Sequence, residues 1–173
     1  MDACRGRARV ITVNSSWQRA PWADVHYSSD APWWDYHLAR GMRAASRGEF
    51  WTGDPTYRPP GMRGVRFSKP LRGISRRPGV IAWGGNSGYC ALGLAVQFGA
   101  ARVLLLGYDM QGDTHWHGDH PDEIRKDFAF AMWRERFGEA ARDLRRMGVA
   151  VINCSRETAL DCFERASIQE ALC

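Results

Sequence analysis

Three of the chain's five histidines stand in one short segment, in the pattern H-x-H-x-D-H. They are His115, His117 and His120. Imidazole nitrogens at this spacing can bind a transition metal, or can transfer protons near neutral pH. A binuclear metal centre needs further histidine ligands downstream, and no histidine follows His120. We therefore predict loop side chains that serve in proton transfer or phosphate contact, with at most one weakly held metal ion.

The glycine-rich segment Gly84-Gly-Asn-Ser-Gly88 is a second candidate site, between an apolar run and a predicted helix. Free N–H groups at a helix N-terminus attract anions, and glycines let a ligand approach the backbone. Asn86 and Ser87 can donate to a phosphate or a ribose, but both are also ordinary helix caps. Two interpretations are therefore open. The segment is either a phosphate site at Asn86, Ser87 and Gly88 or a simple capped turn. The segment is neither a P-loop nor a G-x-G-x-x-G loop.

Polar residues also follow the other predicted strands. Asn14 ends the first strand, Asp30 ends the second, and Asp109 follows the strand after the glycine turn. Ligand-binding groups of open α/β sheets gather at the carboxyl ends of strands. We therefore expect these three residues to line one crevice with the glycine turn, the alternative being that each only forms a turn.

Aromatic and basic clusters have both functional and structural interpretations. The cluster Trp33-Trp34-Asp-Tyr36-His37 can stack a base or a sugar ring, or the Trp pair can pack on the sheet. The arginines of the segment 71–77 can clamp phosphates, or can lie in a solvated loop.

The elements that must position these residues alternate between strands and helices. Strands are predicted at 9–13, 23–28, 79–83, 103–106 and 149–152, and helices at 32–46, 89–98, 122–147 and 157–165. The segment 51–77 is rich in proline, glycine and arginine, and is predicted as a loop with one strand-like piece at 65–67. The alternation predicts an α/β, three-layer Rossmann-like domain with a mostly parallel sheet.

The composition limits the class of protein. At 173 residues, 45% hydrophobic and 25% charged, the chain is predicted to form one globular domain over 1–173. No apolar run approaches the ~20 residues of a membrane helix, and the start lacks a signal peptide, so we expect a cytoplasmic protein without a membrane partner. The net charge of +5 favours an anionic partner, and by charge alone a phosphate-bearing ligand fits as well as nucleic acid. Because the arginines are dispersed and no recognised nucleic-acid-binding module is present, we expect a small phosphate-bearing ligand and keep nucleic-acid binding only as a third hypothesis. The five cysteines form no C-x-x-C pair and are predicted to be reduced thiols.

Four stretches of the sequence resemble known families: VITVNSSW from Val10, APWADVHYSSDAPWW from Ala20, GNSGYCALGLAVQFGAARVLLLGYDMQ from Gly85, and VINCSRETALDCF from Val151. Together they resemble a family of domains of unknown function that includes an archaeal 6-hydroxymethylpterin diphosphokinase and many phage and prophage proteins. They are also similar to the related bacterial sialyltransferases. The resemblance covers about residues 8 to 165, and its most specific part is S-G-x-x-x-A-x-x-x-A-x-x-x-G-A followed by L-x-G-x-D, from Ser87 to Asp109.

The resemblance implies a nucleotide-binding domain in which Asn14 contacts the ribose or base, while Asn86, Ser87 and Gly88 hold the phosphate. It also implies a phage or prophage origin, hence the host cytoplasm, and a catalytic histidine from the loop of His115, His117 and His120. The G-x-G-P-S-L loop that usually begins these families is missing from the sequence. The chain is thus N-terminally short relative to the family, and a homo-oligomer that completes the sheet is one option.

Two functional hypotheses follow. The first is a transferase-like enzyme that acts on a nucleotide-activated donor, with glycosyl transfer from a nucleotide-sugar favoured over pyrophosphoryl transfer. A loop histidine would be the general base of glycosyl transfer, whereas Asp109 would help hold Mg²⁺ in pyrophosphoryl transfer. The second is a non-catalytic phage or prophage accessory protein that keeps the fold and binds a nucleotide without turnover.

Overall fold

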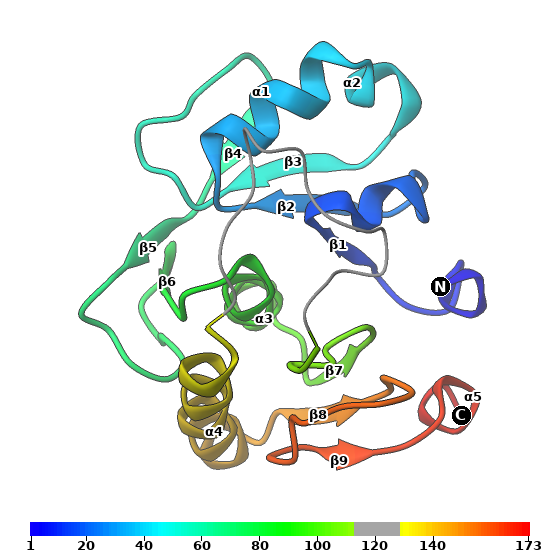
Figure 1. The fold of residues 1–173 in the computed structure, drawn as a ribbon, viewed down its shortest axis with the longest axis vertical. Helices are drawn as coiled ribbons and strands as arrows, with labels where there is room; N and C mark the ends of the chain where they lie inside the picture. The colour runs from blue at the N-terminus through cyan, green and yellow to red at the C-terminus, as the bar shows by residue number, and fades with distance from the viewer. Residues whose placement is uncertain (113–128) are drawn as a thin grey trace. The chain divides into compact units, whose positions relative to one another are not determined.

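The computed structural model describes residues 1–112 and 129–173. Contacts within the chain divide the described residues into two compact units, one of residues 1–66 and one of residues 67–112 and 129–173. Both units are built from short strands and helices (Figure 1).

The first unit is built on a four-stranded sheet. Its strands are β1 (Ile11–Val13), β2 (Val25–Ser28), β3 (Glu49–Thr52) and β4 (Met62–Gly64). They lie in the order β1-β2-β3-β4, and every neighbouring pair is parallel. The register places His26 opposite Thr12 on one side and Phe50 on the other. All four residues of β2 are buried, as expected for a strand covered on both faces.

Two helices follow β2 in the first unit, α1 (Ala31–Ala39) and α2 (Met42–Ala45), after the 3₁₀ helices η1 (Asp2–Cys4) and η2 (Asn14–Gln18). A single helix over 32–46 was expected, and this is wrong because Gly41 adopts a left-handed conformation with φ 85° between the two. Trp33 and Trp34 form a core cluster with Met42 and Phe50. The tryptophan pair therefore packs inside this unit.

The second unit holds the glycine turn. Its strands are β5 (Arg66–Ser68), which begins at the last residue of the first unit, β6 (Val80–Ala82), β7 (Arg102–Leu105), β8 (Ala150–Asn153) and β9 (Glu164–Arg165). Strand β5 pairs with β6, while β7, β8 and β9 form a parallel three-stranded sheet in that order. The helices are α3 (Ser87–Gln97), α4 (Phe130–Met147) and α5 (Ile168–Ala171).

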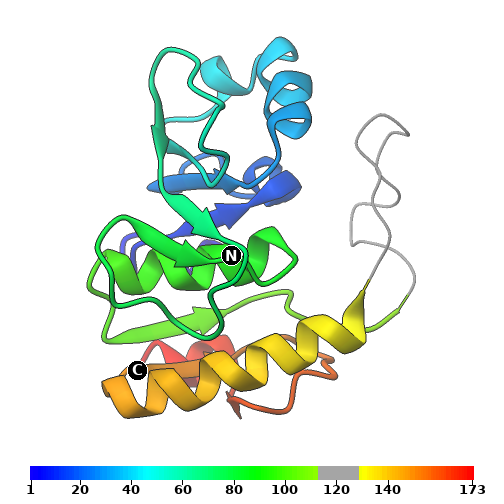
Figure 2. The same cartoon turned by 90° about the vertical axis from the view of Figure 1, so that its left-hand side faces the viewer.

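The core of the second unit lies between α3, α4 and the strands β7 and β8 (Figure 2). Phe137 is fully buried and makes edge-on ring contacts with Tyr89, Tyr108 and Phe163. The apolar face of α4 supplies this packing, as its amphipathic sequence predicts. The predicted helix 122–147 is thus confirmed from Phe130 onward, and residues 122–128 lie outside the described part of the chain.

The architecture confirms the predicted α/β class with mostly parallel strands, in three sheets of four, two and three strands. Two further local predictions are wrong. The segment 51–77 was expected to be a loop with one strand-like piece at 65–67; that piece is present as β5, but the segment also contains a second strand, β4. The helix expected at 157–165 is a loop that leads into β9, because side-chain hydrogen bonds from Asn153 and Thr158 hold its backbone in another conformation.

The described residues have two further features, which concern membrane spans and cysteines. None of their helices is long and apolar enough to cross a membrane. All five cysteines are free thiols, with Cys4 and Cys90 buried.

Candidate functional site

The glycine turn joins β6 to the N-terminus of α3. Asn86 is the N-cap residue: its φ of −150° is extended, and its Oδ1 accepts a hydrogen bond of 2.8 Å from the Tyr89 N–H. This is the ordinary capping function of asparagine. The capped-turn interpretation is therefore correct for Asn86 Oδ1, which is occupied by the helix itself.

Gly84 is required by the packing around it, and Gly85 by its backbone conformation, which L side chains rarely adopt. A side chain at Gly84 would collide with the ring of Tyr89, which is buried and donates its hydroxyl hydrogen to the Gly73 carbonyl at 2.8 Å. A Cβ at Gly85, whose φ is +87°, would lie 2.6 Å from Met132 Cε on α4. Their presence is therefore explained without a ligand.

One atom of the turn is not explained by capping or packing. Asn86 Nδ2 is buried and has no hydrogen-bond partner among the described residues. A buried N–H donor without an acceptor costs about 1–3 kcal/mol, so such a group indicates an acceptor that is supplied from elsewhere. Ser87, the next residue, is only 5% exposed.

Asp109 follows β7 at the carboxyl end of that strand. The hydroxyl of the preceding residue, Tyr108, donates to the Gly88 carbonyl at 3.0 Å, which ties the loop after β7 to the first turn of α3. Met110 has a φ of +52°, an uncommon conformation for a residue with a side chain. The second unit thus brings Asn86, Ser87 and Gly88 close to the loop that carries Asp109.

Glu157, which was not predicted as a site residue, interacts electrostatically with Asp109. Partial desolvation and the negative charge of Glu157 raise the pKa of Asp109 above its ordinary value. The Ala159 N–H donates to the Asp109 carbonyl at 2.8 Å, which fixes the loop after β8 beside the loop after β7. Glu157 follows β8 much as Asp109 follows β7, and this position relative to the strand is the signal that would have found it.

A pair of carboxylates is the kind of ligand that Mg²⁺ prefers. The described residues contain no group of three or more His, Cys, Asp and Glu side chains placed to hold a metal ion. Asp109 and Glu157 would therefore contribute two oxygen ligands, and the remaining ligands would have to be water or substrate phosphate, as is usual for Mg²⁺.

A buried polar network holds these two loops. Asn153, at the end of β8, is fully buried. Its Nδ2 donates to Thr158 Oγ1 at 3.1 Å, and its Oδ1 accepts from the Ser155 N–H at 3.0 Å. Thr158 Oγ1 donates to the Tyr108 carbonyl at 2.7 Å, and Ser155 Oγ accepts from the Tyr108 N–H at 2.7 Å. The network therefore fixes the backbone that precedes Asp109.

The predicted site residues Asn14 and Asp30 belong to the first unit. Asn14 follows β1 with a φ of +47°, and its Oδ1 is buried without a hydrogen-bond partner among the described residues. Asp30 occupies the N-cap position of α1, and its N–H donates to Ser28 Oγ at 3.3 Å. Each residue stands at the carboxyl end of its strand, as predicted. A single crevice that unites them with the glycine turn stays a prediction.

The predicted catalytic histidines, His115, His117 and His120, lie outside the described residues. Of the arginines of the segment 71–77, Arg72 forms ion pairs with Glu135 and Glu139 on α4, at 3.3 and 2.9 Å. The positive charge of Arg72 is therefore paired with acidic side chains of the same unit.

The chain matches no family model, no curated protein and no solved structure. The resemblance described above therefore stays a prediction.

Replacing Gly84 with alanine is expected to lower the free energy of unfolding by about 1–3 kcal/mol, because the new Cβ must displace the buried Tyr89 ring. Gly138→Ala is the matched control. Gly138 lies within α4 and a Cβ there has no neighbour within 4 Å, so this change should raise stability by about 0.5–1 kcal/mol. Urea denaturation of both variants measures the difference, and equal effects would contradict the packing role of Gly84.

Proposed function

We propose that the chain is a transferase-like protein that binds a phosphate-bearing nucleotide donor, with the phosphate at the N-terminus of α3. The observation that carries the proposal is the buried Asn86 Nδ2, which has no acceptor among the described residues. It lies at the start of an eleven-residue helix, where free N–H groups and the helix dipole favour an anion. A phosphate oxygen would satisfy both requirements.

Asp109 and Glu157 have a second part in the proposal. Their mutual repulsion is relieved when a cation lies between them, so we propose that they take part in holding Mg²⁺ beside the donor phosphates. The acceptor's general base is proposed to be one of His115, His117 and His120. Glycosyl transfer from a nucleotide-sugar is favoured over pyrophosphoryl transfer. We also propose that the chain is a phage or prophage protein that acts in the host cytoplasm. Assembly into a homo-oligomer is one option.

A panel of cytidine, uridine, adenosine and guanosine phosphates tests binding by calorimetry and thermal shift. A ligand at 100 times its dissociation constant should stabilise the protein by ~2.7 kcal/mol. The informative variant is Asn86→Asp, because an aspartate keeps the capping oxygen but replaces the Nδ2 donor with a negative charge. We expect Asn86→Asp to weaken nucleotide binding by about 30-fold or more while the helix stays capped.

Gln169→Glu is the matched control, since it makes the same charge change at an exposed position of α5. It should leave nucleotide affinity within about twofold. Absence of a shift with every nucleotide would refute the proposal. Equal affinities of Asn86→Asp and the control would place the phosphate away from α3.

A second candidate, the non-catalytic accessory protein, is favoured by a different observation. Packing accounts for Gly84, the positive φ accounts for Gly85, and capping accounts for Asn86 Oδ1. An assay for the release of free nucleotide from nucleotide-sugars distinguishes the two candidates. Release would support the transferase. Binding without release, with and without Mg²⁺, would support the accessory protein.

A further inference from the structure

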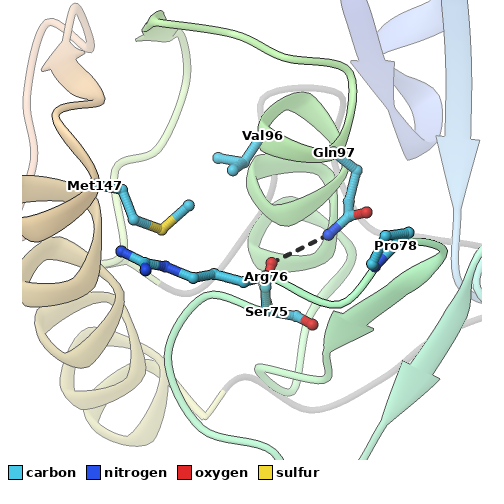
Figure 3. A pocket seen from close by; sticks show the side chains of 6 residues that line it. All are labelled: Ser75, Arg76, Pro78, Val96, Gln97 and Met147. Carbon is cyan, nitrogen blue, oxygen red and sulfur yellow. Dashed lines mark hydrogen bonds between the residues drawn. The ribbon is translucent and has the colours of Figure 1, made fainter.

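A cavity lies at the other end of α3 from the glycine turn, within the second unit (Figure 3). Its volume is about 430 Å³, in the range of small-molecule sites. Six residues line it: Ser75, Arg76, Pro78, Val96, Gln97 and Met147. The length of α3 separates the cavity from the glycine turn by about 15 Å at 1.5 Å per residue. The cavity is therefore distinct from the proposed nucleotide site.

The cavity is open to solvent, and three of the six side chains that line it are apolar. Val96 near the end of α3 and Met147 at the end of α4 are both partly buried, and both pack against the core cluster of this unit. Pro78 adds a third apolar side chain. The cavity thus opens onto hydrophobic surface that water contacts and that an aliphatic group would cover favourably.

The charged group of the cavity is Arg76, whose side chain reaches toward Met147 (Figure 3). No ion pair is formed by Arg76 or Arg77 within residues 1–112 and 129–173. The carboxylate one turn before Met147 belongs to Asp143, and it is already engaged by the Ile74 N–H at 3.0 Å and by Arg146 at 3.3 Å. The guanidinium charge of Arg76 is therefore available to an anion.

The backbone that carries Arg76 is held in place by Gln97. Its Nε2 donates to the Ser75 carbonyl at 3.0 Å and to the Arg77 carbonyl at 3.2 Å, and its Oε1 accepts from the Gly79 N–H at 3.1 Å. Ser75 Oγ accepts from the Arg77 N–H at 3.1 Å. A binding segment fixed before the ligand arrives loses less conformational entropy on binding.

We propose that this cavity binds a small organic anion with an aliphatic body, whose carboxylate or phosphate head is bound by Arg76 and whose body covers Val96 and Met147. A guanidinium suits both heads, because its parallel N–H groups match two anionic oxygens. An inorganic anion would leave the apolar walls uncovered, and an aliphatic cation would be repelled by Arg76. This inference does not depend on the nucleotide proposal.

Three probes separate the contributions to binding: octanoate has the head and the body, acetate has the head alone, and octylammonium has the body with the opposite charge. Calorimetry on the full chain should show octanoate binding at least about tenfold tighter than either of the others. Methyl resonances of Val96 and Met147 should shift with octanoate at the same concentrations.

Arg76→Gln should weaken octanoate binding by at least about tenfold, since it removes the charge and keeps the length of the side chain. Arg156→Gln is the control, at an exposed arginine after β8, and should change affinity by no more than about twofold. Met147→Gln should weaken octanoate binding and leave acetate unchanged. Equal binding of octanoate and octylammonium, or unchanged octanoate binding by Arg76→Gln, would overturn the proposal.

Discussion

The free energy of unfolding should fall by about 3 kcal/mol as the pH is lowered from 6.5 to 4, because His26 has to stay neutral in the folded protein. His26 lies on β2 with 0% of its surface exposed, and its Nδ1 is 2.6 Å from Thr12 Oγ1. Burial lowers its pKa from 6.5 to about 4. Between these two values the unfolded chain binds a proton that the folded protein does not. The contribution of neutral His26 to the free energy of unfolding is therefore fully present above pH 6.5, and it is lost as the pH falls toward 4.

Urea denaturation at a series of pH values measures this effect in the wild type and in His26→Gln. The variant has no imidazole at position 26 to take up a proton, so its stability should change less over the same pH range, whatever its absolute value. The difference between the two slopes isolates His26 from the other histidines. Parallel pH profiles would show that His26 takes up its proton equally in the folded and unfolded chains.

The second large effect is expected at Asn153. Replacing it with leucine should lower the free energy of unfolding by about 3 kcal/mol, because the Ser155 N–H and the Thr158 hydroxyl lose their partner in a buried site. Thr158→Val should lose bonds to the Tyr108 carbonyl and the Leu160 N–H as well. Since both side chains belong to one network, the double variant should lose less free energy of unfolding than the sum of the losses of the two single variants.

Chemical denaturation of the two single variants and the double variant gives this comparison. Thr56→Val is the control, since Thr56 is exposed and its hydroxyl contacts only Asp54 among the described residues, so the expected cost is no more than about 0.5–1 kcal/mol. Additive losses, or a loss of similar size in the control, would mean that the network does not act as a unit.

The central part of the fold was predictable because local signals agree there. Several local signals agree on a strand, a turn, a helix and a second strand in this order. They are the apolar runs of β6 and β7, the cap at Asn86 and the helix-ending glycine at 99. The observed bounds differ from the predicted ones by one or two residues. Strands β3 and β4 were less visible, because Glu49 and Arg63 are exposed and pair with each other across neighbouring strands. Such pairing depends on contacts distant in sequence.

The failed helix at 157–165 shows a different limit. Its apolar residues, including Leu160 and Phe163, are buried in the core, so their hydrophobic character was informative. Their backbone follows another path, because the Leu160 N–H and carbonyl bond the side chains of Thr158 and Asn153 instead of a helical neighbour. Competition by short polar side chains cannot be read from hydrophobic spacing alone.

The candidate site was predicted in part. The positions of Asn14, Asp30, Asn86 and Asp109 after their strands were correct, since strand order and polar ends are visible in sequence. The partner of Asp109, Glu157, was missed because the helix wrongly predicted at 157–165 included it. His26 was missed because nothing in the pattern Val-His-Tyr-Ser distinguishes a buried histidine from one at a strand surface.

Strand β9 has a consequence for how the molecule behaves at high concentration. It covers only the second half of β8, pairing with Ile152 and Asn153, and it ends the three-stranded sheet with two exposed, oppositely charged residues, Glu164 and Arg165. A strand so short and charged is a poor template for another chain, because added strands would have to desolvate both charges. Where β9 covers β8, this side of the sheet is therefore protected against aggregation by strand addition.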